Sequence, residues 1–320
     1  MDYNYIFFDC ETNSGRSHAD ILTISALFVD KNFRLIEEFN CAARLRKSRI
    51  YEIDSFLVNG MDPFEVDKHP FSNFELTKKT NDKFISWVNK GPVLFCAHNG
   101  YQFDFMLTST NLFTNLFTWP WIFSTGNAKQ IDSLPILQNF DFYAPNTIAV
   151  ELNKKSNKTF KLGSLCRING FDLGDKAHTS EADTLGMVKL MKLINKKNPE
   201  LFKKCLSLNN KKNVLPKIKD VDYFCHPETF FGRTRQFTST YLCEHPIYKG
   251  YHLVFDLKHD PEKMFSEKSN AVLGKILNAP PKKYRTIKAN KNPFIQDKSF
   301  ATNYGDEYAT LGHEILKERA

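Results

Sequence analysis

The segment "YIFFDCETNS", residues 5–14, places two acidic residues directly after a run of four hydrophobic ones. The hydrophobic run predicts a buried strand. Alternate residues of a strand point to the same face, so Asp9 and Glu11 are expected side by side at its end. Such carboxylates repel each other unless a multivalent cation lies between them, and Mg²⁺ prefers oxygen ligands. The alternative is an ordinary polar strand end before a turn, so this pair alone does not establish a metal site.

The composition is that of a folded protein with room for two domains, because 42% of the 320 residues are hydrophobic. No stretch approaches the roughly 20 consecutive apolar residues of a membrane span, and the start of the chain lacks the basic residues of a signal peptide. We therefore expect a cytoplasmic protein without a membrane partner. The seven cysteines form no Cys-x-x-Cys pair, so reduced thiols are expected, not a zinc site or disulfides.

The net charge of +8 is unevenly distributed along the chain. Residues 1–200 contain 23 basic and 23 acidic residues, whereas residues 201–320 contain 21 basic and 13 acidic ones. A basic excess confined to one region favours an accessory surface for a polyanion, and the neutral region can supply acids for a metal. The alternative is a lysine-rich surface that serves only solubility.

Hydrophobic patterning predicts a mixed α/β sheet in the first 200 residues. Residues 5–45 are typical of a three-stranded antiparallel meander. A strand over Pro92–Cys96 and another ending at Asp132 are each followed by a helix. A short helix ending at Gly170 precedes a long one, whose buried side is expected to contain Met187, Leu190, Met191 and Ile194. Strands followed by strand-helix units form a sheet flanked by helices.

A lysine- and asparagine-rich segment with a proline follows residue 205 and is interpreted as a boundary region. Beyond it, three segments are typical of strands separated by turns. We therefore predict two domains, residues 1–204 and 205–320, the second a small β-domain. The predicted strands lie in "TRQFTSTYLCEH", "GYHLVFDLKHD" and "YRTIKANKNPFI".

Further candidate ligands lie near the starts of two predicted helices. Asp104 occurs in "HNGYQFDFML", just inside the helix that follows a strand. His178 and Asp183 occur in "AHTSEADTLGMVKL", where the long helix begins and Thr179 or Ser180 can cap it. Each residue has an ordinary interpretation, because acids are favoured in the first turn of a helix and His178 could be a loop histidine. The order and context of the three motifs together indicate a shared site.

These motifs resemble those of the DEDDh exonucleases, which have the ribonuclease H-like fold. "FDCET" is similar to the family's Asp-x-Glu-Thr motif, "AHNGYQFDFML" to its Asn-x-x-x-x-Asp motif, and "AHTSEAD" to its histidine with an aspartate five residues on. The resemblance covers residues 1 to roughly 200. Asp132 could rival Asp104 as the third acid, but it fits better as the polar end of a neighbouring strand.

Within these nucleases, the chain resembles the bacterial exonuclease I family. The similarity lies in "FKLGSLCRINGFDLGDKAHTSEADT" and, more loosely, in "ETFFGRTRQFTSTYLCEHP" and later segments, which are similar to that family's SH3-like domain. Longer members continue into a helical domain that helps to close a clamp around the strand. This chain stops soon after the SH3-like segment, so the resemblance predicts distributive or weakly processive digestion.

The resemblance implies a mechanism and a set of site residues. Asp9, Glu11, Asp104 and Asp183 would hold two Mg²⁺ or Mn²⁺ ions, and His178 would take the proton from the attacking water. The implied reaction removes 5′-mononucleotides from the 3′ end of single-stranded DNA. The expected partners are single-stranded DNA and a single-stranded-DNA-binding protein.

Substrate contacts are expected from aromatic and basic residues. Thr12, Tyr101 and Phe103 lie close in sequence to the expected metal ligands, although Phe103 could equally be a core residue. Arg233 and Arg235 in "FGRTRQF", together with the run "PKKYRTIKANK", are the basic candidates. Two other functions remain open, a DEDDh exoribonuclease and a catalytically silent protein that binds single strands.

Overall fold

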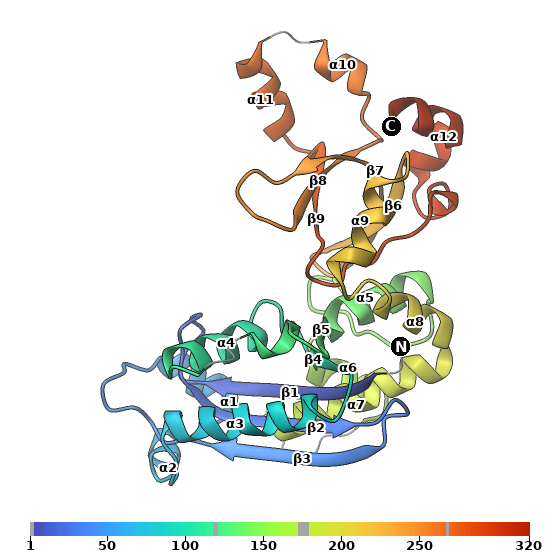
Figure 1. The fold of residues 1–320 in the computed structure, drawn as a ribbon. Helices are drawn as coiled ribbons and strands as arrows, with labels where there is room; N and C mark the ends of the chain where they lie inside the picture. Colours follow the sequence, from blue (N-terminus) through green and yellow to red (C-terminus); the bar gives the residue numbers. More distant parts are fainter. Residues whose placement is uncertain (1–2, 118–120, 172–178, 267–268) are drawn as a thin grey trace. The chain divides into compact units, whose positions relative to one another are not determined.

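The computed structural model describes residues 3–117, 121–171, 179–266 and 269–320. It separates into two compact units, Met1–Glu200 and Leu201–Ala320 (Figure 1). Helix α8 (Pro199–Leu206) crosses both this division and the boundary expected after residue 204. Each unit is described by itself below.

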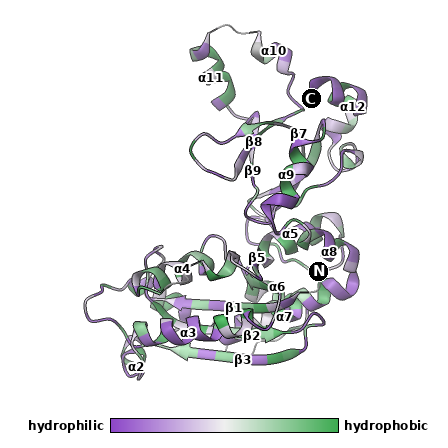
Figure 2. Ribbon diagram, in the orientation of Figure 1, coloured by the Kyte–Doolittle hydropathy of each residue, from purple (hydrophilic) through white to green (hydrophobic). Residues whose placement is uncertain are grey.

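The first unit is built on a five-stranded mixed sheet, which confirms the predicted fold class. β1, β2 and β3 form the antiparallel meander expected for residues 5–45, and β4 and β5 continue the sheet parallel to β1. β2 is almost entirely hydrophobic and buried (Figure 2). In spatial order the strands are β3 (Leu35–Ala42), β2 (Ile21–Val29), β1 (Asn4–Thr12), β4 (Val93–Ala97) and β5 (Ala128–Asp132).

Helices cover both faces of this sheet. Ile6, Phe8 and Cys10 of β1 point to the face where α3 (Asn73–Val88) and α4 (Asp104–Thr114) complete the main hydrophobic cluster. Helix α7 (Ser180–Lys197) packs against β1 and β2, on the opposite face that Asp9 and Glu11 share. The other helices of the unit are α1 (Ile53–Asn59), α2 (Pro63–Asp67), α5 (Ser133–Tyr143) and α6 (Leu162–Ile168).

Helix α7 begins as its sequence requires. The Thr179 hydroxyl accepts a hydrogen bond from the backbone N–H of Ala182, as an N-cap residue does. Asp183 lies in the first turn, where a carboxylate is favoured by the helix dipole. The predicted buried side of the helix is confirmed; its residues are Met187, Leu190, Met191 and Ile194.

The second unit contains a four-stranded antiparallel sheet in the order β6-β7-β8-β9. The three strands predicted from the sequence are confirmed, and β6 was not predicted. The segment expected as a boundary forms α9 (Lys211–Lys219), which buries Val214 and Ile218 in the unit's core. The strands are β6 (Phe224–Phe230), β7 (Arg233–Glu244), β8 (Tyr251–Asp256) and β9 (Tyr284–Lys288), and the remaining helices are α10 (Pro261–Phe265), α11 (Asn270–Asn278) and α12 (Asp306–Arg319).

Two composition-based expectations can be compared with the structure. All seven cysteines are free thiols, and six of them are buried; Cys243 is exposed. Within the described ranges, no helix has both the length and the apolar character needed to cross a membrane.

Candidate active site

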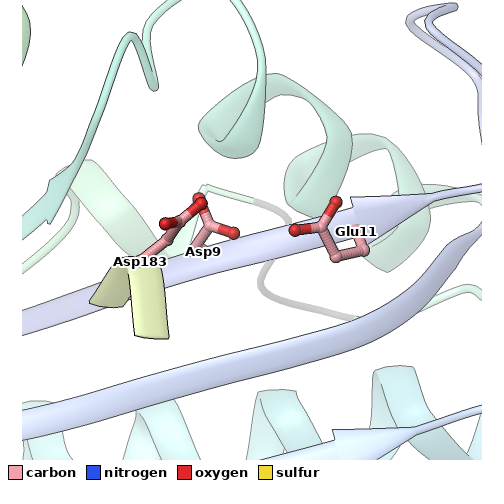
Figure 3. A group of neighbouring side chains, drawn as sticks. All are labelled: Asp9, Glu11 and Asp183. Atoms are coloured by element: carbon pink, nitrogen blue, oxygen red, sulfur yellow. The ribbon is translucent and has the colours of Figure 1, made fainter. Parts of the chain in front are cut away.

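Three carboxylates from β1 and α7 converge at one point of the first unit. Asp9, Glu11 and Asp183 each offer an oxygen, and these oxygens all lie within 4.8 Å of one another (Figure 3). Strand alternation places Asp9 and Glu11 on one face, and α7 brings Asp183 to that face from 172 residues further along the chain than Glu11. The three residues are half-buried, so they remain accessible to a ligand.

A cluster of hydroxyl groups fastens the start of α7 to β2 beside these acids. The Ser180 hydroxyl lies 2.9 Å from that of Ser25 and 3.3 Å from that of Thr23. Ser25 and Thr23 are the cross-strand partners of Asp9 and Glu11. The cluster therefore holds Asp183, three residues after Ser180, in register with the carboxylates of β1.

We expect the double variant Ser25→Ala/Ser180→Ala to bind Mn²⁺ about tenfold more weakly, the usual scale for losing outer contacts that orient metal ligands. Because the double variant removes both members of the Ser25–Ser180 hydrogen bond, the loss of stability should be smaller than the sum of the losses in the single variants. Calorimetric titration with Mn²⁺ and thermal melts measure the two effects. Ser72→Ala, which removes the capping box of α3, should lower stability and leave Mn²⁺ affinity unchanged; equal affinity in all variants would contradict the positioning role.

Asp104 approaches the cluster from the first turn of α4. Its Oδ1 accepts a hydrogen bond of 3.1 Å from the backbone N–H of Cys10, and only 2% of the residue is exposed. It is outside the tight group of three but lines the same cleft, of about 380 Å³, as Asp9, Glu11 and Asp183. The structure thus brings together all four acids that the sequence singled out.

Burial, and after it the nearby carboxylates, raises the pKa values of Asp9, Glu11 and Asp104. Burial, followed by the charges of Asp104, Glu11 and Asp183, raises the pKa of Asp9 well above its ordinary value. Burial and the charges of Asp183 and Asp104 raise the pKa of Glu11 to about 8. Burial also raises the pKa of Asp104 to about 7, against the hydrogen bonds that it accepts. Full ionisation of the cluster therefore needs a compensating cation.

The remaining wall of the cleft mixes apolar and polar groups. Phe103 is half-buried and lines the cleft, as a substrate contact must. His98 is held on both sides, with Nδ1 2.9 Å from the Ser133 hydroxyl and Nε2 2.8 Å from the carbonyl oxygen of Phe160. Burial lowers the pKa of His98 to about 4, so its imidazole is neutral at pH 7. The other lining residues are Cys10, Val58, Asn59, Asn99 and Gln102.

Two expected substrate contacts, Thr12 and Tyr101, form hydrogen bonds to backbone carbonyls of the first unit. Thr12 is buried, and its hydroxyl donates to the carbonyl oxygen of Ser14 at 2.8 Å. The Tyr101 hydroxyl donates to the carbonyl oxygen of Gln130 at 2.9 Å, and its ring packs near that of Phe105. Neither residue is among those that line the cleft.

The other residues predicted for the site lie outside this cleft's lining or outside the described residues. His178 lies outside the described residues. Arg233 and Arg235 lie on β7 of the second unit. Val58, Asn59 and the hydroxyl cluster were not predicted, because no local pattern marks a residue that reaches the site from another element.

The carboxylate of Asp132 stabilises the turn in which the residue lies. Its carboxylate accepts hydrogen bonds from the backbone N–H groups of Asn99 at 2.8 Å, Leu134 at 3.0 Å and Tyr101 at 3.2 Å. It caps α5 at the end of β5. Asp104, whose carboxylate lines the cleft with the other acids, is therefore the better candidate for the third acid of the site.

Comparison with known proteins identifies the fold class. No family model matches the chain. The structure is similar to exonuclease I from Methylocaldum szegediense (TM-score 0.82, 17% identity, covering 99% of this chain and 69% of that one). It is also similar to E. coli exonuclease I in complex with a dA16 oligonucleotide, with a TM-score of 0.81 and 18% identity. That match covers 99% of this chain and 72% of the E. coli chain. An ExoI/SSB-Ct complex gives a comparable match, with a TM-score of 0.81 and 17% identity, covering 100% of this chain and 70% of that one. The chain has the ribonuclease H-like fold followed by an accessory β-unit.

Within that class, the chain is similar in sequence to bacterial exodeoxyribonuclease I. It is 26% identical over 249 residues to the enzyme of Buchnera aphidicola subsp. Schizaphis graminum, covering 75% of this chain and 50% of that protein. A second Buchnera aphidicola exodeoxyribonuclease I, from subsp. Acyrthosiphon pisum, is 24% identical over 226 residues, 69% of this chain and 52% of that protein. The chain therefore spans about half the length of the curated relatives it matches. The predicted resemblance to exonuclease I is confirmed.

Proposed function

We propose that the chain is a metal-dependent 3′-5′ exonuclease that hydrolyses single-stranded DNA to 5′-mononucleotides. The convergence of Asp9, Glu11 and Asp183 within 4.8 Å carries this proposal. Two acids of β1 and one of α7, held this close together and half-buried, cost folding free energy unless a cation balances them. The similarity to exodeoxyribonuclease I selects phosphodiester hydrolysis among the reactions that such a site supports.

The donor set fits hard divalent cations. Every proposed ligand is a carboxylate, and all-oxygen sites suit Mg²⁺ and Mn²⁺ better than softer metals. We assign two such ions to Asp9, Glu11, Asp104 and Asp183, because four carboxylates balance two dications. When bound, the ions would activate a water molecule and stabilise the leaving 3′ oxygen.

We assign proton transfer and substrate positioning to residues around this cluster. His178 would accept the proton of the attacking water, since an ordinary imidazole titrates near neutral pH. Phe103, on the wall of the cleft, would contact the terminal nucleotide. Thr12 and Tyr101, which lie close in sequence to Glu11 and Asp104, are proposed as further contacts of that nucleotide, with their hydroxyls donating to the carbonyl oxygens of Ser14 and Gln130.

The second unit would hold the strand through its basic surface. The proposed partners are single-stranded DNA and a single-stranded-DNA-binding protein, in the cytoplasm. The first rests on the basic excess of residues 201–320, and the second on the similarity to an exonuclease solved with an SSB-Ct peptide.

A labelling experiment tests the proposed function. Strands of DNA and RNA labelled at the 3′ or the 5′ end are incubated with the protein, with Mg²⁺ or with EDTA. Immediate release of mononucleotide from 3′-labelled DNA, only with Mg²⁺, is expected. Faster release from RNA would support the exoribonuclease alternative, and binding without cleavage the silent-binder alternative.

Neutralising Arg233 and Arg235 with glutamine should weaken binding of single-stranded DNA and reduce its salt dependence. Each lost phosphate contact removes about 0.7 from the slope of log K against log salt, so the double variant should lose about 1.4. Titration in EDTA over a range of salt concentrations, without turnover, measures this slope.

The matched control replaces Lys68 and Lys78 with glutamine. These lysines pair with Glu65 and Asp82, so they add little free positive charge. Their double variant should keep the wild-type slope. An equal change of slope in both double variants would contradict a specific role for the two arginines.

A further inference from the structure

The hairpin between β6 and β7 has an unusual residue at its tip. Phe230 pairs with Arg233, so Phe231 and Gly232 form a two-residue loop. Their φ angles are 50° and 74°. Positive φ at both positions is the requirement of a type I′ turn, for which Asn-Gly and Asp-Gly are the favoured sequences. Glycine meets the requirement at the second position, but a bulky phenylalanine at the first is strained.

The side chain at this strained position is also exposed. Phe231 has 89% of its surface accessible, and its neighbour Phe230 has 45%. A phenylalanine in water contributes none of the burial free energy that usually explains an aromatic residue. The backbone conformation therefore disfavours Phe231, and burial does not stabilise it. A residue that is strained and gains no packing energy is a candidate for a functional role.

Two cations flank the exposed rings. Arg233 and Arg235 are exposed residues of β7 and lie two positions apart, hence on one face of the strand. Phe230, the cross-strand partner of Arg233, shares that face. Neither guanidinium forms an ion pair with any residue in the described part of the chain, so both remain available to an anion.

A stacked column on the face that Phe230 shares with Arg233 and Arg235 supports the hairpin. The guanidinium of Arg285 lies 3.8 Å from the centroid of the buried Phe237 ring and 5.8 Å from that of Phe230. Glu228 fixes Arg285 through an ion pair of 3.1 Å. The column holds the base of the tip in place before any ligand arrives, which lowers the entropic cost of binding.

We propose that this hairpin tip, Phe230–Arg235, is a binding site for an unpaired nucleotide of the substrate strand. A base stacks on Phe231, and Arg233 and Arg235 hold the phosphates beside it. Exposed aromatic rings next to cations are the mode by which proteins bind single strands without reading their sequence. The site selects unpaired over paired DNA, because a base within a duplex presents no free face. This inference rests on the proposed function and adds a stacking residue to it.

Phe231→Asn is the decisive variant, because it separates binding from folding. Asparagine is favoured at this turn position, so the melting temperature should rise by roughly 2 °C or more. Affinity for an oligothymidylate strand in EDTA should nevertheless fall roughly tenfold, the scale of one lost base stack. The salt slope should stay unchanged, in contrast to the Arg233 and Arg235 variants. A variant that melts higher and binds as well as the wild type would overturn the proposal.

A matched control and a matched ligand sharpen the result. Phe64 on α2 is also exposed, at 80%, but stands among Asp62, Glu65 and Asp67, so Phe64→Asn should leave DNA affinity unchanged. A strand of abasic nucleotides should bind the wild type and Phe231→Asn equally, because it offers no base to stack. If the wild type bound the abasic strand roughly tenfold more tightly than Phe231→Asn did, as expected for the normal strand, stacking would be contradicted. A wild-type protein that neither binds nor cleaves the normal strand would instead refute the proposed function itself.

Discussion

Replacement of Asp9 by asparagine is expected to lower nuclease turnover by roughly 10³-fold or more, the scale of several kcal/mol of lost transition-state stabilisation at a metal centre. The same result is expected for Asp183→Asn and for the wild type in EDTA. Both residues belong to the three-carboxylate group, so each substitution removes a ligand without opening a cavity. Release of mononucleotide from 3′-labelled single-stranded DNA measures the effect.

Although these variants should lose turnover, their thermal stability should stay the same or increase. Asp9 has a raised pKa because of burial and neighbouring carboxylates, so its ionisation at neutral pH opposes folding. In EDTA, Asp9→Asn should therefore melt at the same temperature as the wild type or higher, and it should still bind DNA. Asp132→Asn is the control, because this carboxylate accepts three backbone hydrogen bonds and its loss should destabilise the protein. Full turnover in Asp9→Asn, or its failure to fold, would contradict the assignment.

Local sequence patterns were sufficient to predict the sheet and the acids. The hydrophobic run before Asp9 predicts β1, and strand alternation predicts that Asp9 and Glu11 share a face. Caps and hydrophobic spacing likewise predict the start of α7 and its buried side. Such features depend only on neighbours in the chain, so a single sequence contains them.

Features that depend on distant contacts could not be predicted in this way. Ser25 and Ser180 are 155 residues apart, and neither has a local pattern that marks it. Tyr101 was predicted as a substrate contact from its position near Asp104, but no local pattern shows that its hydroxyl donates to the carbonyl oxygen of Gln130 in β5. The lysine- and asparagine-rich segment was predicted as a boundary region, and its composition did not show that Val214, Leu215 and Ile218 would pack α9 against the core of the second unit. In each case tertiary packing decides the outcome.

His178→Ala is expected to lower turnover by roughly 10²-fold or more, the usual loss when a general base is removed. His178 directly precedes the Thr179 cap of α7 and stands five residues before Asp183, in the motif shared with the DEDDh exonucleases. An ordinary imidazole has a pKa of about 6.5, so the wild-type rate should fall as pH decreases through that value. The variant should lack this acidic limb, because it has no imidazole to protonate. Turnover rates of the wild type and the variant from pH 5 to 9 at saturating Mg²⁺ measure both the loss of rate and the loss of the acidic limb.

His98 provides the control, because it is the histidine that lines the cleft among the residues that the structure describes. Its two ring nitrogens are engaged by Ser133 and Phe160, and burial lowers its pKa to about 4. A group with that pKa cannot cause a change of rate near pH 6.5, so His98→Ala should retain the acidic limb and lose stability instead. If His178→Ala kept the wild-type limb while His98→Ala lost it, the general base would be His98, and the resemblance would have misassigned the proton transfer.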